Sequence, residues 1–238
     1  MTPPPPDPSA EPPPAAPSRT RIKICGVKDA PTARVVAESG ADLIGFVFIE
    51  RSPRFLPYAA ARAIAADLPD TVTPVALVNH LSEPRQFDEL HRESGIRWVQ
   101  LHGDEPPELA GRVPDCPLLR SLPAPKADDA DLVAAWATHQ NVEAFLWDAP
   151  ASPGNPLGGG SGQTSDWAWL RGRLPAAPPS ILAGGLTPDN VGRAIRTVRP
   201  WGVDVSSGVE SSRGVKDHGL IRAFCAAVRE ADASLALD

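Results

Sequence analysis

The sequence predicts a single (β/α)8 barrel of parallel strands, which is an α/β fold of the TIM-barrel type. Short apolar runs alternate with helical patterns about eight times, and the connections between them are short. Continuous apolar runs of this length are typical of strands buried on both faces, as in parallel sheets. Eight such units favour one closed barrel. A doubly wound open sheet is the alternative, but no GxGxxG motif follows the first strand, which disfavours a dinucleotide-binding fold.

The elements are expected in strict alternation along the chain. The strands are the apolar runs at 20–25, 42–48, 73–78, 97–101, 117–122, 143–147, 180–184 and 202–207. The helices follow them at 30–39, 58–68, 84–94, 106–113, 127–139, 166–171, 188–198 and 217–230. Thr187 offers an N-cap with Pro188 at the first helical position, and we expect Ser82 to cap the helix that starts at Pro84 in the same way. The last helix carries an apolar stripe at i, i+3, i+4 and i+7 from Ile221.

The chain is expected to divide into a tail and one domain. Residues 1–19 are almost all Pro, Ala, Ser and acidic residues. Because proline lacks an N–H donor and fixes its φ, we expect 1–19 to be a disordered, Pro-rich N-terminal extension. Residues 20–238 are expected to form the barrel, which is the catalytic domain. The start of the chain lacks the basic and apolar regions of a secretory signal.

Composition and charge exclude several classes of function. The chain is 42% hydrophobic and 22% charged, as expected of a globular protein that buries a core. Its net charge of −6 gives no basic field for nucleic acid or an acidic membrane, and no apolar run approaches the ~20 residues of a membrane span. Cys25, Cys116 and Cys225 lie far apart without metal-ligand spacing, which disfavours disulfides or a zinc site and favours the cytoplasm. We expect Cys116 and Cys225 to be small buried hydrophobes.

Gly- and Ser-rich turns follow three neighbouring strands of the predicted barrel. They are "GGGSGQT" (158–164), "AGGLTPDN" (183–190) and "SSGVE" (206–210). Glycine lets backbone N–H groups close on an anion, and barrels often bind phosphate in the loops after strands seven and eight. The first turn taken alone would equally suit a flexible linker. Together the three turns predict a phosphate site, and the absence of a Lys-bearing Walker loop favours a sugar phosphate over a nucleoside triphosphate.

A thiol and a carboxylate are placed where a barrel carries its chemistry. Cys25 ends the first strand next to Gly26, and Asp148 ends the sixth. A lone cysteine is often just a buried hydrophobe, and an aspartate there often an N-cap or ion-pair partner. As a base and an acid near neutral pH, the thiol needs a nearby cation and the carboxylate needs burial. Lys23, two residues before Cys25, is the expected partner that favours the thiolate.

Other polar residues follow the strands. Arg54 offers a planar fork for a substrate carboxylate, with a solvated loop arginine as the alternative. His102 is a candidate pocket residue or a loop histidine satisfied by water. Asp204 lies on the last strand and is a candidate either for the pocket or for a structural ion pair. We expect Asp104 and Glu105 to form the N-terminal cap region of the fourth helix.

A set of motifs runs through residues 20–230 in a fixed order: "KICGV", "GADLIGFVF", "SPR", "VQLHGDE", "LWDA", "GGSGQTSDW", "ILAGGLTPDNV" and "GVDVSSGVE". In order and spacing they resemble the phosphoribosylanthranilate isomerase family of tryptophan biosynthesis. The resemblance implies an isomerase that converts N-(5-phosphoribosyl)anthranilate into 1-(2-carboxyphenylamino)-1-deoxy-D-ribulose 5-phosphate by an Amadori rearrangement. It further implies that Cys25 is the general base and Asp148 the general acid.

The same resemblance implies the binding residues and the partners. Arg54 would meet the anthranilate carboxylate, while His102 and Asp204 would line the pocket. The phosphate would be held by the backbone at Gly160, Gly162, Gly184, Gly185, Ser206 and Ser207. No metal or organic cofactor is implied, because the substrate nitrogen serves as the electron sink. The expected protein is a cytoplasmic monomer or homodimer that binds a small phosphorylated substrate.

Two other functions stay open at this point. The first is another sugar-phosphate barrel enzyme: a Schiff-base aldolase would need a lysine at an inner strand end, and the chain has four lysines. The related histidine-pathway isomerases pair two aspartates, whereas this chain has Cys25 in the first of those places. The second is a phosphate-binding barrel without catalysis. Intact Cys25 and Asp148 disfavour that alternative.

Overall fold

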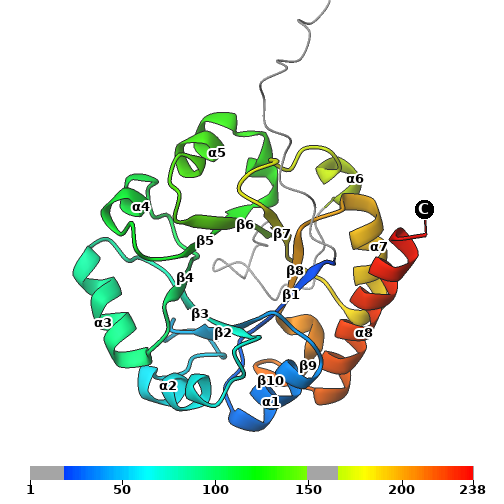
Figure 1. Cartoon of the computed structure of the whole chain (residues 1–238), viewed down its shortest axis with the longest axis horizontal. Helices are drawn as coiled ribbons and strands as arrows, with labels where there is room; N and C mark the ends of the chain where they lie inside the picture. Colours follow the sequence, from blue (N-terminus) through cyan, green and yellow to red (C-terminus); the bar gives the residue numbers. More distant parts are fainter. Residues whose placement is uncertain (1–18, 149–165, 238) are drawn as a thin grey trace, which may run out of the picture.

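The structure, a computed structural model, describes residues 19–148 and 166–237. Within these residues, strands β1 to β8 pair in sequence order, all parallel, and β1 closes the ring against β8. Figure 1 looks into this ring, with the helices packed around its outside. The predicted closed (β/α)8 barrel is therefore confirmed, and the open sheet is excluded.

The observed elements lie close to the predicted ones. The barrel strands are β1 Arg21–Cys25, β2 Leu43–Val47, β3 Thr73–Val78, β4 Trp98–Leu101, β5 Leu118–Pro123, β6 Val142–Asp148, β7 Ser180–Leu182 and β8 Gly202–Val205. The helices are α1 Ala30–Glu38, α2 Tyr58–Ala66, α3 Pro84–Ser94, α4 Glu108–Arg112, α5 Ala130–Ala137, α6 Trp167–Leu170, α7 Pro188–Val198 and α8 His218–Leu235. The sequence did not predict the 3-10 turns η1 Ala124–Asp128 and η2 Ser207–Val209, or the antiparallel hairpin of β9 Glu210–Ser212 and β10 Val215–Lys216.

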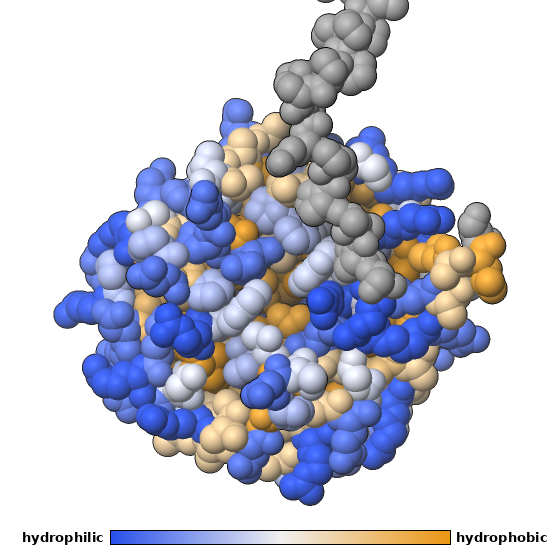
Figure 2. All heavy atoms as spheres, in the orientation of Figure 1, coloured by the Kyte–Doolittle hydropathy of each residue, from blue (hydrophilic) through white to orange (hydrophobic). Residues whose placement is uncertain are grey.

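Both faces of the barrel strands are buried, as the continuous apolar runs predict. On β2, Ile44 and Phe46 belong to the large cluster shared with the surrounding helices, whereas Leu43 belongs to a second cluster inside the barrel. The interior cluster also contains Leu119 of β5 and Leu146 of β6. The alternation along each strand therefore tells which residues point into the barrel. Figure 2 shows a largely hydrophilic rim around the face viewed there.

Two predicted helix caps have different outcomes. Thr187 forms a capping box with Asn190 at the start of α7, which confirms its predicted role. Ser82 is not the N-cap of α3. Glu83 holds that position and forms the capping box with Gln86, whose side-chain oxygen accepts from the Glu83 N–H at 2.9 Å. The Gln86 side chain accepts from the backbone N–H of Glu83, the residue just before Pro84. Glu83 is therefore the N-cap, where Ser82 was expected.

The predicted N-terminal extension, 1–19, lies outside the described residues except for Arg19. The Arg19 side chain donates to Asp42 at 2.6 Å, so the last residue of the predicted extension already contacts the barrel. No helix within 19–148 and 166–237 combines the length and the hydropathy that crossing a membrane requires.

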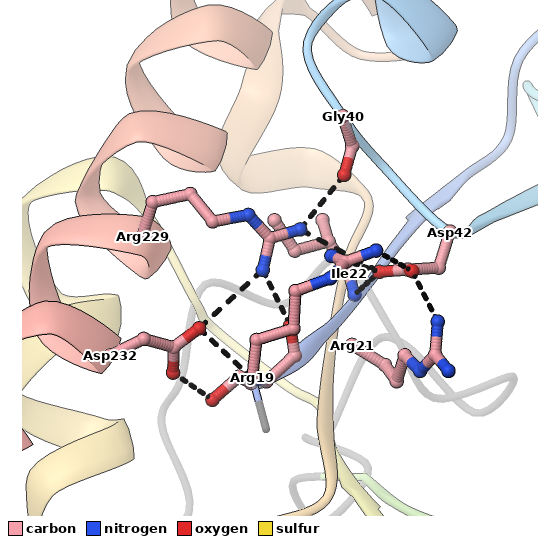
Figure 3. Close-up of polar contacts among 8 residues, drawn as sticks. Arg19, Arg21, Ile22, Gly40, Asp42, Arg229 and Asp232 are labelled. Atoms are coloured by element: carbon pink, nitrogen blue, oxygen red, sulfur yellow. Dashed lines mark hydrogen bonds and ion pairs between the residues drawn. The ribbon is translucent and has the colours of Figure 1, made fainter. Parts of the chain in front are cut away.

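A cluster of polar side chains closes the amino-terminal end of the barrel (Figure 3). Asp42, just before β2, accepts hydrogen bonds from Arg19 at 2.6 Å, from Arg21 at 2.7 Å and from the Ile22 backbone N–H at 2.9 Å. This carboxylate is almost fully buried although both arginines are half exposed. One side chain thereby fixes the start of β1 against the start of β2.

Helix α8 joins the same cluster. Arg229 donates to the Thr20 carbonyl at 2.7 Å and to the Gly40 carbonyl at 2.8 Å. Asp232 accepts from the Thr20 backbone N–H at 2.9 Å. These contacts tie the first strand to the last helix, which stabilises the closure of the ring at the end of the barrel away from the strand carboxyl termini.

We expect Asp42→Asn to lower the free energy of unfolding by about 1–3 kcal/mol, because the amide turns an N–H2 group toward buried donors that need an acceptor. Urea unfolding followed by circular dichroism measures the change. Arg19→Ala is the control, and should cost less than about 1 kcal/mol because its ion pair is half exposed. Equal losses in the two variants would contradict the role given to the buried carboxylate.

Candidate active site

The predicted base and the predicted acid lie at the same end of the barrel, each as the last residue of a strand. Cys25 is the last residue of β1 and Asp148 is the last residue of β6. In a parallel barrel the carboxyl ends of all strands meet at one end. Asp148 comes two residues after Leu146 of the interior cluster, so strand alternation turns it toward the barrel axis. Cys25 is buried and packs against Val47 and Leu77 on the interior side.

Two glycines make room for the thiol and the turn that follows it. Gly45 lies opposite Cys25 in the β1–β2 register, and a Cβ there would lie 2.8 Å from Cys25 Sγ. Gly26 has φ +79°, in the left-handed region, and a Cβ on it would collide with the Arg54 side chain. The "CG" pair therefore lets β1 end abruptly, with its thiol inside and an arginine packed over the turn.

A buried ion pair lies one layer below the thiol. Lys23 Nζ donates to Asp204 Oδ1 at 2.8 Å, and the two residues are register partners on β1 and β8. The Lys23 side chain is 1% exposed. Burial lowers the pKa of Lys23, but the charges of Asp204 and Cys25 outweigh it and leave that pKa raised. Asp204 therefore has the ion-pair role that was one of the alternatives for it.

The thiol itself keeps its proton to higher pH than an ordinary cysteine. Burial is the largest influence and raises the pKa of Cys25. The charge of Lys23 lowers that pKa, as predicted, and so does the charge of Lys216, whereas Asp204 raises it. The predicted contribution of Lys23 is thus present, but it does not bring the pKa of Cys25 below its usual value.

Arg54 lies at this edge with its guanidinium fork on a glutamate. Arg54 Nε and Nη2 donate to Glu210 Oε1 and Oε2 at 2.7 and 2.8 Å. Lys216 Nζ donates to the same Oε1 at 2.9 Å, and the Gly214 N–H donates to Oε2 at 3.0 Å. Burial raises the pKa of Glu210, but the hydrogen bonds and charges of Arg54 and Lys216 outweigh it and lower this pKa to about 2.

Glu210 and Lys216 are site residues that the sequence analysis did not single out. They belong to the hairpin β9–β10, where they are register partners. A signal was present, since "SSGVE" and "GVKD" both lie just after the last strand. These motifs alone do not predict that the two residues interact. The interaction depends on the hairpin that pairs them and on the loop after β2 that brings Arg54 to them.

The turns after β7 and β8 lie against each other at the same end. Gly184 and Gly185 have φ +81° and +63°, the left-handed conformations that glycine permits. A side chain on Gly208 would collide with the backbone of Leu186, so the two turns make close contact. Ser206 and Ser207 begin the 3-10 turn η2 that follows β8. The predicted contributors Gly160 and Gly162 lie outside the described residues.

The loop after β4 differs from expectation. His102 is half buried at the end of β4, and its N–H donates to the Val78 carbonyl at 2.9 Å. Glu105 is not a cap of α4: the helix begins at Glu108, and the Glu105 carboxylate turns inward to Arg120 at 2.7 Å. The prolines at 106 and 107 delay the helix, which frees Glu105 to accept from the Gly103 N–H at 3.0 Å as well.

Asp104, the other predicted cap residue, is exposed and also precedes the helix start. Within the described ranges, no three His, Cys, Asp or Glu side chains gather in a way that would hold a metal ion. The arrangement instead brings together a thiol, a carboxylate, an arginine fork and two glycine turns. Such a set can bind an anionic sugar phosphate and move protons on it.

Comparison with known proteins gives a consistent result. A family model described as N-(5'phosphoribosyl)anthranilate (PRA) isomerase matches residues 22–227. An N-(5'-phosphoribosyl)anthranilate isomerase of Leptothrix cholodnii is 42% identical over 222 residues, which are 92% of this chain and 94% of that relative. The solved phosphoribosyl anthranilate isomerase of Thermus thermophilus is similar with a TM-score of 0.75 and 32% identity, over 89% of this chain and 99% of that one.

A second solved structure adds a ligand. It is a phosphoribosyl anthranilate isomerase in complex with reduced 1-(o-carboxyphenylamino)-1-deoxyribulose 5-phosphate. It is similar with a TM-score of 0.73 and 32% identity, over 89% of this chain and 99% of that chain.

We expect Lys23→Met to raise the pKa of the Cys25 thiol, because the variant removes a buried cation and leaves Asp204 without its partner. The rate of iodoacetamide alkylation of Cys25 as a function of pH, read by peptide mass spectrometry, measures the change. The double variant Lys23→Met/Asp204→Asn removes both charges of the pair together, and it should change the pKa of the Cys25 thiol much less. Equal changes in the single and double variants would show that the pair acts through packing rather than charge.

Proposed function

The chain belongs to the N-(5'-phosphoribosyl)anthranilate isomerase family, and on that premise we propose that it works by general acid–base catalysis with Cys25 as base and Asp148 as acid. It catalyses the isomerisation of N-(5-phosphoribosyl)anthranilate to 1-(2-carboxyphenylamino)-1-deoxy-D-ribulose 5-phosphate, a step of tryptophan biosynthesis. The observation that carries the proposed mechanism is the placement of both groups on the inner, carboxyl-terminal edge of one closed barrel.

The first proton transfer opens the sugar. Asp148 gives its proton to the furanose ring oxygen as the bond from that oxygen to C1′ breaks. The lone pair of the anthranilate nitrogen forms the double bond to C1′, which leaves a protonated Schiff base. The position of Asp148 at the end of β6, half buried and turned toward the axis, supports this role.

The second proton transfer completes the rearrangement. The Cys25 thiolate takes the proton from C2′, and the electrons of that bond form the C1′–C2′ double bond while the nitrogen becomes neutral. The resulting enolamine accepts a proton at C1′ and loses one from the C2′ hydroxyl, which gives the aminoketone. Each positioned proton transfer is worth roughly 10²–10⁴-fold in rate. The substrate nitrogen holds the electrons throughout, so these steps require no metal or organic cofactor.

The binding groups follow from the same geometry. We propose that the turns at Gly184–Gly185 and Ser206–Ser207 hold the phosphate, because their neighbouring strands and contacting loops offer backbone N–H groups to one anion. Arg54 would meet the anthranilate carboxylate with the side of its guanidinium group that faces away from Glu210, since Nε and Nη2 donate to Glu210. His102 would line the pocket from the end of β4.

Asp204 fits the proposal as the partner that fixes Lys23, from which position it faces the interior below the pocket. This pair also bears on the Schiff-base aldolase alternative. A lysine that attacks a carbonyl must present a neutral amine, whereas Asp204 and Cys25 hold the pKa of Lys23 above its usual value. The isomerase mechanism uses Lys23 as a charge and not as a nucleophile.

We also propose the setting in which the enzyme acts. Its net charge of −6 supports a protein that has no nucleic-acid partner. The biosynthetic family supports a cytoplasmic enzyme, and we propose that it acts as a monomer or homodimer. Residues 20–238 would be the catalytic domain, since the family match covers residues 22–227.

We expect Cys25→Ala to fold, to keep its affinity for a product analogue, and to lose kcat by about 10²–10⁴-fold. The reason is that alanine cannot take the C2′ proton, while the binding groups stay in place. The fall in anthranilate fluorescence of freshly made substrate, compared with wild type, measures the rate. A variant that kept most of its kcat would contradict the role of Cys25 as base.

We expect Asp148→Asn to lose kcat to a similar degree with little change in KM, because an amide has almost the shape of the acid but no proton to give. The same fluorescence assay applies, with circular dichroism as the check on folding. A variant that raised KM and kept kcat would mean that Asp148 positions the substrate and does not act as the acid.

A further inference from the structure

The charged side chains near Cys25 include two groups that differ in net charge. Among the described residues at this edge, Lys23 and Asp204 form a pair with no net charge. Arg54, Glu210 and Lys216 form a second group in which one carboxylate faces two cations. The second group therefore carries one uncompensated positive charge.

This uncompensated charge is buried. The side chains of Arg54, Glu210 and Lys216 are 12%, 3% and 3% exposed. A buried charge without a counterion is costly, and burial lowers the pKa of Lys216 although the charges of Glu210 and Cys25 raise it. The arrangement therefore favours a negative group nearby. The Cys25 thiol is a neighbouring group that can become negative, and the charge of Lys216 lowers its pKa.

We propose that Lys216 is a positioning residue whose ammonium group supplies the countercharge for the Cys25 thiolate. This inference rests on the proposed function, because it matters for catalysis only if Cys25 is the base. It assigns a role in the reaction to the hairpin β9–β10, which carries Lys216 over the end of β1.

The geometry holds the ammonium group in one place. Lys216 Nζ donates to the Ser206 carbonyl at 2.8 Å and lies 3.3 Å from Ser206 Oγ. Ser206 Oγ in turn donates to the Cys25 carbonyl at 3.1 Å. A chain of hydrogen bonds therefore runs from Lys216 through the end of β8 to the backbone of the thiol residue. A mobile surface lysine would lose most of its electrostatic effect to solvent, whereas this one is fixed and dry.

The other cations at this edge act on the thiol differently. Lys23 lowers the pKa of Cys25 more than Lys216 does, but it lies 2.8 Å from Asp204, whose charge raises that pKa and opposes the effect of Lys23. Arg54 uses both nitrogens of its fork on both oxygens of Glu210. Lys216 donates to one of those oxygens, so Glu210 fixes the position of the Lys216 ammonium group. Its single negative charge does not cancel the two positive charges of Lys216 and Arg54.

The sign of the pH dependence follows from these groups. The charges of three residues act on the thiol, namely Lys23 on β1, Asp204 on β8 and Lys216 on β10. Glu210 accepts from Lys216 and from Arg54 and so acts through them. Removing a cation raises the pKa of the thiol, so a smaller fraction is thiolate at a given pH. Removing Glu210 has the opposite sign, because it leaves both cations uncompensated. Replacement of Lys216 should therefore raise the pKa of the Cys25 thiol, and replacement of Glu210 should lower it.

The experiment measures iodoacetamide alkylation of Cys25 against pH in the full chain, with peptide mass spectrometry to identify the modified cysteine. We expect Lys216→Met to slow alkylation near neutral pH by about tenfold and Glu210→Gln to speed it up. Lys216→Arg keeps the charge and should stay near wild type. Cys116 and Cys225 serve as internal references, because burial raises their pKa values to about 12 and about 11.

A merely structural role would give a different result. Loosening of the hairpin would change the alkylation rate of Cys25 in the same direction in Lys216→Met and in Glu210→Gln. That outcome would overturn the proposal. So would an unchanged alkylation profile in a folded Lys216→Met. Should Lys216→Met fail to fold, the direction of change in Glu210→Gln still decides the matter.

Activity separates this inference from the proposed function. If both hold, the rise of kcat/KM with pH moves to higher pH in Lys216→Met, while KM changes little. If Cys25→Ala keeps its activity but Lys216→Met slows alkylation, the assignment of Cys25 as base fails and the countercharge stands. If Cys25→Ala is inactive and alkylation is unchanged in Lys216→Met, the base stands and the countercharge fails.

Discussion

A thiol that must lose its proton inside a closed barrel requires positive charge close to it in a place without water. Most of the polar architecture at this end of the barrel serves that requirement. Burial favours the protonated form of Cys25, and the side chains of the two lysines that oppose this effect are themselves buried. Each lysine in turn needs a carboxylate, which the structure supplies from β8 and from β9. The site is therefore a set of charges that hold one another in place.

The barrel separates this set from the contacts that stabilise its closure. At the amino-terminal end, Asp42 and Asp232 join β1 to β2 and to α8 through half-exposed arginines and backbone donors. At the carboxyl-terminal end, the ion pairs are almost fully buried and lie near Cys25. In this fold, residues at the first end generally contribute to stability and residues at the second end to catalysis, so we expect sequence changes at the two ends to have separate effects.

Much of the fold follows from local patterns, since strands buried on both faces leave continuous apolar runs and proline with a capping residue marks the start of α7. The strand-end positions of Cys25 and Asp148 follow in the same way. The network around them does not, because Glu210 and Lys216 acquire their role through contacts with Arg54, some 160 residues earlier in the chain. Glu105 was misjudged for a related reason: its partner Arg120 is on another strand. Local sequence patterns do not predict contacts between side chains that lie far apart in the chain.

The arrangement of Glu210 shows why the network needs three residues rather than two. A carboxylate that faced Lys216 alone would cancel its charge and remove its effect on the thiol. By taking the fork of Arg54 as well, Glu210 fixes the lysine through a hydrogen bond while a positive charge stays uncompensated. The strong hold of both cations is seen in the pKa of Glu210, which falls to about 2, so the carboxylate stays ionised wherever the thiol titrates. Glu210 thus fixes the positions of both cations while the three residues together keep a positive charge.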